Sequence, residues 1–138
     1  MKKLNELYRA IDTSDDISLF YYPIEDVPAA TIEYKGKYGI FLDLRKISTT
    51  REEKEILAHE IGHVETGATH RVDSPYDLIE KHEELAARAS IHRLVPLIEF
   101  RDAIKKGYTE IWALAEYFNL GEDFIRKAVD VYQAENVL

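Results

Sequence analysis

The stretch His59-Glu60-Ile61-Gly62-His63 decides how this sequence is interpreted, because it places two histidines and a glutamate at helical spacing. Residues four apart lie on the same side of an α-helix, one turn from each other. The imidazoles of His59 and His63 can therefore bind one metal ion. Glu60 follows the first histidine, where its carboxylate can take a proton from a water. This HExxH arrangement makes metal-dependent hydrolysis the leading hypothesis.

The residues around the motif predict one amphipathic helix. The segment Thr50-Arg51-Glu52-Glu53 has the pattern of a capping box, so the helix is expected to begin near Thr50 and to stop at Gly67. Gly62 inside the helix costs about 1 kcal/mol relative to alanine, and a close approach of backbone or substrate at that turn would explain it. The alternative is a charged helix whose histidines are solvated or held in the core. An apolar stripe completes the pattern: Ile56, Leu57, Ile61 and Val64.

Composition limits the possible functions. The 138 residues suffice for one domain, 1–138, with one modest core. A net charge of −8 argues against broad phosphate binding, so no direct contact with nucleic acid is expected. Without cysteine, any metal must be held by histidine, aspartate or glutamate, and the composition suits a reducing compartment. No apolar stretch approaches the length of a membrane span, so a cytoplasmic location is expected.

The order of predicted elements is a helix, three strands and then only helices, which is an α+β pattern. Ser74-Pro75 is expected to cap the second long helix, and Lys35-Gly36-Lys37 to form a hairpin loop. The expected helices cover residues 4–11, 50–66, 76–94, 97–106, 109–118 and 121–135, and the expected strands cover 17–24, 29–34 and 38–44.

A catalytic zinc usually takes three protein ligands, so a third ligand is expected downstream of the motif. The helix 76–94 carries a stripe of small residues that starts at Ala86 and lets two helices approach closely. Glu83 lies on that stripe, whereas Glu84 lines up with a neighbouring one and remains a rival. From the pattern alone, seven candidates stay open: His70, Asp73, Glu80, His82, Glu83, Glu84 and His92.

Three segments of the chain resemble the ImmA/IrrE family of intracellular, zincin-like metallo-endopeptidases. They are Tyr38-Gly39-Ile40-Phe41-Leu42-Asp43, Glu55-Ile56-Leu57-Ala58-His59-Glu60-Ile61-Gly62-His63, and Glu83-Glu84-Leu85-Ala86 up to Leu94-Val95-Pro96. In that family an xLAHExGH helix follows a strand. A later helix has the pattern Glu-x-x-Ala-(Asn/Asp)-x-aromatic-Ala and ends near a proline. The resemblance covers roughly residues 30 to 135, and it implies a small zincin-like fold.

The resemblance also implies a site and a substrate. The family's third zinc ligand falls on Glu83, beside His59 and His63, and Glu60 would act as general base. Members occur in phages and mobile elements, where they cut helix-turn-helix repressors of the XRE type and so relieve repression. The alternative function is a non-catalytic docking module, an anti-repressor with a structural or vestigial zinc site. Ala87 and Ala89 depart from the family pattern beyond the ligand, which concerns helix packing more than metal binding.

Two further features of the site stay open. A second hydrogen-bond donor to the oxyanion that forms during hydrolysis is usual in such sites. The strand Tyr38–Leu44 either offers an edge to an extended peptide or is paired on both sides. Four residues are candidate oxyanion donors by location: His70, Arg71, Tyr76 and His82.

Within the C-terminal helices, about 97–135, the segment 114–125 resembles a helix-turn-helix in its turn spacing. The second helix of that unit opens with Glu122-Asp123 and carries only Arg126 and Lys127 as basic residues. Acidic side chains at that position repel phosphates. Packing against the core or docking of a protein is therefore expected in place of DNA binding.

Overall fold

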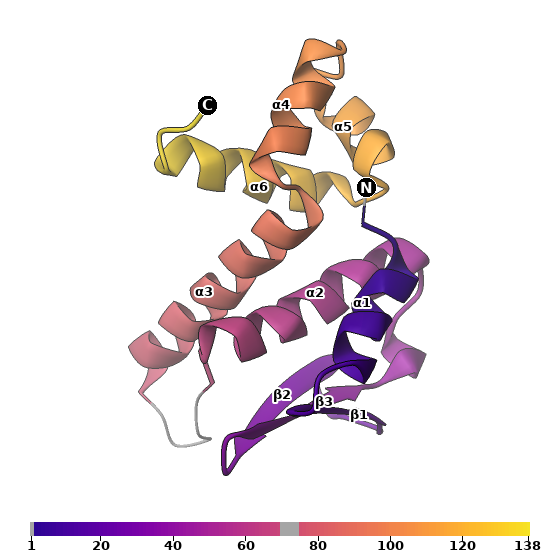
Figure 1. Ribbon diagram of the computed structural model, residues 1–138, viewed down its shortest axis with the longest axis vertical. Coiled ribbons are helices and arrows are strands. Elements are labelled where there is room, and N and C mark those ends of the chain that lie inside the picture. The colour runs from indigo at the N-terminus through magenta and orange to yellow at the C-terminus, as the bar shows by residue number, and fades with distance from the viewer. Residues whose placement is uncertain (1, 70–74) are drawn as a thin grey trace.

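The computed structural model describes residues 2–69 and 75–138, with the side chain of Tyr76 excepted, and it has the predicted α+β architecture (Figure 1). The elements are α1 (Leu4–Asp12), β1 (Ile17–Tyr21), β2 (Ala29–Tyr34), β3 (Lys37–Leu42), the 3-10 helix η1 (Leu44–Lys46), α2 (Thr50–Thr66), α3 (Tyr76–Leu94), α4 (Leu97–Lys105), α5 (Ile111–Phe118) and α6 (Glu122–Ala134). None of the helices among the described residues is long and apolar enough to span a membrane.

The three strands form one sheet in the order β1-β3-β2. β1 runs parallel to β3, with Ile17 opposite Tyr38, and β2 runs antiparallel to β3. Lys35 and Gly36 join the β2–β3 hairpin with φ of 51° and 79°, as a two-residue turn requires. β3 is therefore the central strand, and the interpretation of Tyr38–Leu44 as an exposed edge is wrong, because β1 pairs with β3 on the side opposite β2.

One face of the sheet packs on α1 and α2, and the other face is uncovered in Figure 1. The covered face presents Ile40 and Leu42 to the core, and both are fully buried. On the opposite face the rings of Phe20 and Phe41 stack with their centroids 4.9 Å apart. We call this second surface the aromatic sheet face, and define it by Phe20, Ile32, Tyr34 and Phe41.

Helices α2 and α3 approach each other at Gly62. A Cβ atom at Gly62 would lie 2.5 Å from the carbonyl oxygen of Ala86, a distance that no real side chain tolerates. The predicted close approach at that turn is thus confirmed, and a neighbouring backbone causes it. α2 begins at Thr50 as expected, but its N-cap is Thr49 in place of Thr50, because Thr49 Oγ1 accepts the Glu52 N–H at 3.1 Å. α3 has Pro75 at its N-cap position, and the expected cap at Ser74 lies outside the described residues.

The first half of α2 also holds the turn between α5 and α6, residues 118–121, which we call the α5–α6 turn. Arg51 donates to Asn119 Oδ1 at 2.8 Å and to the Leu120 carbonyl at 3.3 Å. The ammonium of Lys54, a buried side chain, donates to the carbonyl of Phe118 at 3.2 Å. Both cations therefore stand at the C-terminal end of α5, where the helix dipole favours positive charge.

The N-terminal end of α6 receives a carboxylate from the same helix. Glu55 Oε2 accepts the backbone N–H of Gly121 at 2.8 Å, which satisfies one of the free donors at the start of α6. Glu55 lies one turn before His59 on α2. The position of α6 relative to the motif helix is therefore set by direct contacts.

Candidate metal centre

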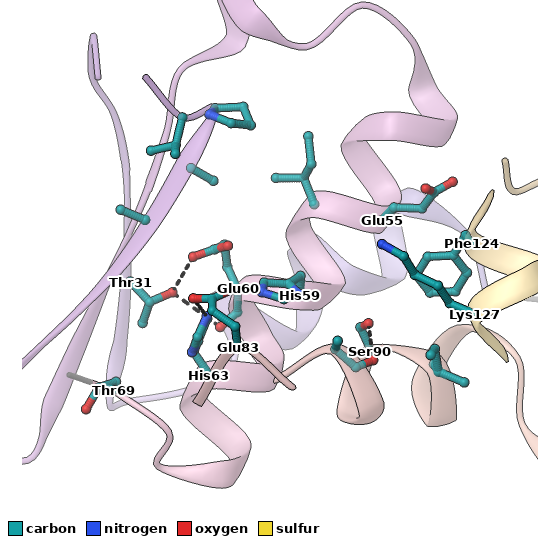
Figure 2. A pocket seen from close by; sticks show the side chains of 17 residues that line it. Thr31, Glu55, His59, Glu60, His63, Thr69, Glu83, Ser90, Phe124 and Lys127 are labelled. Carbon is teal, nitrogen blue, oxygen red and sulfur yellow. Dashed lines mark hydrogen bonds and ion pairs between the residues drawn. The ribbon is translucent and has the colours of Figure 1, made fainter. Parts of the chain in front are cut away.

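The two histidines of α2 and one glutamate of α3 converge on a single point (Figure 2). Nε2 of His59 lies 2.8 Å from Oε2 of Glu83, and Nε2 of His63 lies 3.1 Å from Oε1 of the same carboxylate. The small Ala86 and Gly62 let the helices come close enough for this contact. The structure thus brings together His59, Glu60, His63 and Glu83, the four residues singled out from the sequence.

The other candidates for a third ligand do not join this cluster within the described residues. Glu84 pairs with Arg88 at 3.1 Å on the same helix. His92 pairs with Glu135 at 3.0 Å, near the C-terminal end of α6. Neither Glu80 nor His82 lines the cleft described below. The candidates His70 and Asp73 lie outside the described residues.

The chemistry of the donors fits a metal ion. The ligand atoms of His59, Glu60 and His63 all lie within 4.8 Å of one another. His63 Nδ1 lies 2.6 Å from the carbonyl oxygen of Ala68, which can only accept, so Nδ1 carries the proton. Nε2 of His63 is then the nitrogen that is left to bind a metal, in the orientation that such second hydrogen bonds give to metal ligands.

Hydrogen bonds link the Glu83 carboxylate to the imidazoles of His59 and His63. Hydrogen bonds from His59 and then from His63 hold the pKa of the Glu83 carboxyl well below its usual range. Burial of the His63 ring opposes its positive charge, but Glu83 and the Ala68 carbonyl outweigh burial and raise its pKa. A carboxylate with two imidazoles around it is a set of groups that a divalent cation can bind in place of protons.

Glu60 is the most enclosed carboxylate of the cluster, with 7% of its surface exposed. Burial raises its pKa, while the hydroxyl of Thr31 and the neighbouring histidines act in the opposite direction. Thr31 Oγ1 lies 2.9 Å from Glu60 Oε1 and comes from β2 (Figure 2). Sequence reasoning missed Thr31. The alternation of the strand, which turns Ala29, Thr31 and Glu33 to one side, was the signal that could have found it.

A cleft of about 590 Å³ surrounds these groups. Its walls come from β2 and the segment before it, from α2, from α3 and from α6. Figure 2 shows Thr31 and Thr69 at one end and Phe124 and Lys127 at the other, with His59 between them. Among the expected oxyanion donors, His82 is absent from the lining. His70, Arg71 and the Tyr76 side chain lie outside the described residues.

The His59-Glu60-His63 cluster on α2 of this α+β fold fits the HExxH motif of metallopeptidases. A family model described as the IrrE N-terminal-like domain, a peptidase family, matches residues 13–130. The chain belongs to this family, and the resemblance found from its motifs is confirmed. No significant match was found among curated proteins or among solved structures.

Proposed function

We propose that the protein is a zinc-dependent endopeptidase whose metal ligands are His59, His63 and Glu83. The convergence of two imidazole nitrogens on one carboxylate carries this proposal, because it is the His₂Glu donor set of catalytic zinc sites. A bound zinc ion would supply a Lewis acid that polarises the scissile carbonyl and makes a water nucleophilic at neutral pH.

Glu60 is proposed as the general base. Its carboxylate lies beside both histidines and accepts a hydrogen bond from Thr31, so its orientation is restricted. Burial raises its pKa, which suits a group that must take a proton from the attacking water and then release it to the leaving amine. Burial of this carboxylate costs stability, because a surrounding of low dielectric constant disfavours its charged form.

The substrate is proposed to bind in extended form along β2. Among the described residues β2 pairs with β3 alone, so its second edge is available for main-chain hydrogen bonds. Ala29, Ala30 and Thr31 of this strand line the cleft. A peptide added to that edge would run past Glu60.

The substrate class is proposed to be an XRE-type helix-turn-helix repressor, cut in the cytoplasm of a cell that carries a phage or mobile element. The support is the family resemblance together with the charge of the chain. A net charge of −8 and the pair Glu122-Asp123 at the start of α6 disfavour binding to DNA itself. A protein that acts on transcription without binding DNA needs a protein target.

The aromatic sheet face favours a second candidate function. Ile32 and Tyr34 are 56% and 71% exposed on it, and such a patch is typical of a surface that binds another protein. A docking module, or anti-repressor, would use this face and need the zinc site only for its fold.

Metal content and cleavage together test the proposed peptidase. The parent and Glu84→Ala, a matched control on the same helix, should each hold about one zinc per chain, whereas Glu83→Ala should lose it. Glu60→Gln should keep zinc but no longer cut candidate repressors, and His59→Ala should lose both properties. A parent that binds no zinc would reject the peptidase and favour the docking module, whereas a Glu60→Gln variant that still cleaves would reject Glu60 as the general base.

A further inference from the structure

The cleft extends well beyond the metal centre. Figure 2 shows Thr31 and His63 toward one end and Phe124 and Lys127 at the other, with Glu55 above the second end. This second end we call the α6 subsite, and define it by Glu55, Ile56, Ile91, Phe124 and Lys127. It lies directly against the catalytic groups, because Glu55 is one turn from His59 on α2.

The walls of the α6 subsite are held in place by the contacts around the α5–α6 turn. Glu55 accepts the Gly121 N–H at 2.8 Å, and Arg51 donates to Asn119 and Leu120. Phe124 and Lys127 lie three residues apart on α6, so they share one face of that helix. A subsite fixed to the motif helix in this way can select a substrate side chain at a constant distance from the scissile bond.

The chemistry of the subsite is apolar with one cation. Ile91 is buried, and Ile56 and Phe124 are half-buried. Together they form an apolar wall of the subsite. Lys127 is exposed and extends from α6 into the cleft (Figure 2). It is the only lysine or arginine among the described residues that line the cleft.

Glu55 is the competing charge, but its carboxylate is already engaged. One oxygen accepts the Gly121 N–H, and the side chain is half-buried. The charge of Lys127 acts on Glu55, yet the two groups form no ion pair within the described chain. A substrate carboxylate can therefore approach Lys127 from the open side of the cleft, whereas a substrate cation that pairs with the other oxygen of Glu55 would meet the like charge of Lys127 on the same wall.

We propose that the α6 subsite selects an acidic side chain of the substrate, with its methylene groups against Phe124 and Ile56 and its carboxylate paired with Lys127. This inference rests on the proposed peptidase function and adds the substrate class to it. Lys127 is then a specificity-determining residue, and it takes no part in the hydrolysis.

Binding of zinc-directed ligands tests the subsite without any cleavage. Short peptide hydroxamates would carry glutamate, glutamine or lysine at each of the first three positions from the hydroxamate, and their affinities for the zinc-loaded protein would be measured by calorimetry. At one position the glutamate form should bind about two- to fivefold more tightly than the glutamine form, as partly exposed ion pairs allow. High salt should reduce this preference.

Charge variants of α6 test whether Lys127 causes the preference for glutamate. Lys127→Met should remove it and Lys127→Glu should reverse it in favour of lysine. Lys105→Glu, which makes the same charge change on an exposed lysine of α4 away from the cleft, should leave it intact. Equal affinities at all positions would overturn the proposal, as would a glutamate preference that survives in Lys127→Glu. A lysine preference that disappears in Glu55→Gln would overturn it in favour of a basic substrate residue.

Cleavage of a proteome-derived peptide library separates this inference from the proposed function. If the parent cuts peptides with aspartate or glutamate enriched at one fixed position, and Lys127→Glu loses that enrichment, both proposals stand. Cleavage without any charge preference would reject the subsite and leave the peptidase. Charge-selective binding of hydroxamates without cleavage of any peptide would reject the peptidase and leave the subsite.

Discussion

The hydroxyl group of Thr31 lies 2.9 Å from Oε1 of Glu60, and this contact links the sheet to the motif helix within the cleft. A hydroxyl donates one proton, and Glu60 Oε1 is closer to it than the Glu60 carbonyl, which lies at 3.3 Å. The carboxylate proposed as general base is therefore oriented by the strand proposed to hold the substrate. A displacement of β2 would therefore move the proposed base and the substrate together.

Replacement of Thr31 by valine should lower kcat about tenfold while KM and zinc content change little. Valine keeps the shape of threonine but removes the hydroxyl, so Glu60 loses a donor that restricts its orientation. Thr69→Val is the matched control, because Thr69 also lines the cleft but its hydroxyl bonds to Glu33 at 2.9 Å. Steady-state kinetics with a cleavable peptide would measure the difference. Equal losses in the two variants would show that Thr31 has no special role.

A methyl group at Gly62 should destabilise the protein and weaken its affinity for zinc. The added Cβ would lie 2.5 Å from the Ala86 carbonyl oxygen, so α2 and α3 must separate and Glu83 must move from the histidines. We expect Gly62→Ala to lose about 1–3 kcal/mol of stability, even after the gain in helix propensity. Chemical denaturation of the metal-free protein isolates the packing effect, and a zinc titration measures the ligand effect. Unchanged stability would contradict the close approach.

Loss of the carboxylate at Glu55 should loosen the start of α6. Glu55→Ala removes the acceptor for the Gly121 N–H, and loss of such a cap costs about 1 kcal/mol. Glu55→Gln keeps an oxygen acceptor in the same place and should retain most of the stability. Amide hydrogen exchange would locate the change at residues 121–125 in Glu55→Ala. Protection there that is equal in both variants would show that the contact contributes nothing.

Asp43 should make the stability of the metal-free protein depend on acid pH. The Arg45 side chain and then the Ile24 N–H hold the pKa of this buried carboxyl far below its ordinary value of 3.8. In the unfolded protein this carboxyl has a pKa of about 4, so its stabilising contribution is complete above that pH. The contribution is lost as the pH falls toward the lower pKa of the folded state.

Urea unfolding between neutral pH and pH 3 would measure this contribution. Asp43→Asn should be less stable than the parent at neutral pH, and its stability should fall less steeply below pH 4. Asp16→Asn, a change at an aspartate whose side chain is 68% exposed, should follow the parent curve. Parallel curves for the parent and Asp43→Asn would contradict the assignment.

The parts of the fold that depend on local pattern could be predicted from the sequence. The helix around residues 59–63 follows from periodicity and its stop at Gly67, and the order of helices and strands follows from turn residues. The presence of Gly62 inside a helix indicated a close approach at that turn, and the small residues of α3 indicated that two helices lie close together. Glu83, one of the seven candidates from the pattern and the position to which the family resemblance assigns the third ligand, lies beside both histidines.

The parts that depend on distant contacts could not be predicted. β3 is central because β1 and β2 pair with its two edges, and nothing in the segment Tyr38–Leu44 distinguishes a central strand from an edge. Thr31 and Glu60 are separated by 29 residues, and Glu55 and Gly121 by 66. Such contacts depend on the tertiary arrangement, while a sequence pattern reports only on neighbours along the chain.

The one-sided pairing of β2 has a consequence for the products of digestion. The hydrogen-bonding groups of a strand repeat every two residues, so a peptide held by its main chain alone can slide by two residues and find the same contacts. The protein would then release a ladder of fragments whose ends differ by two residues. Cleavage at a single bond requires a substrate side chain that fixes the register. This requirement grows with the length of the substrate segment that can become extended.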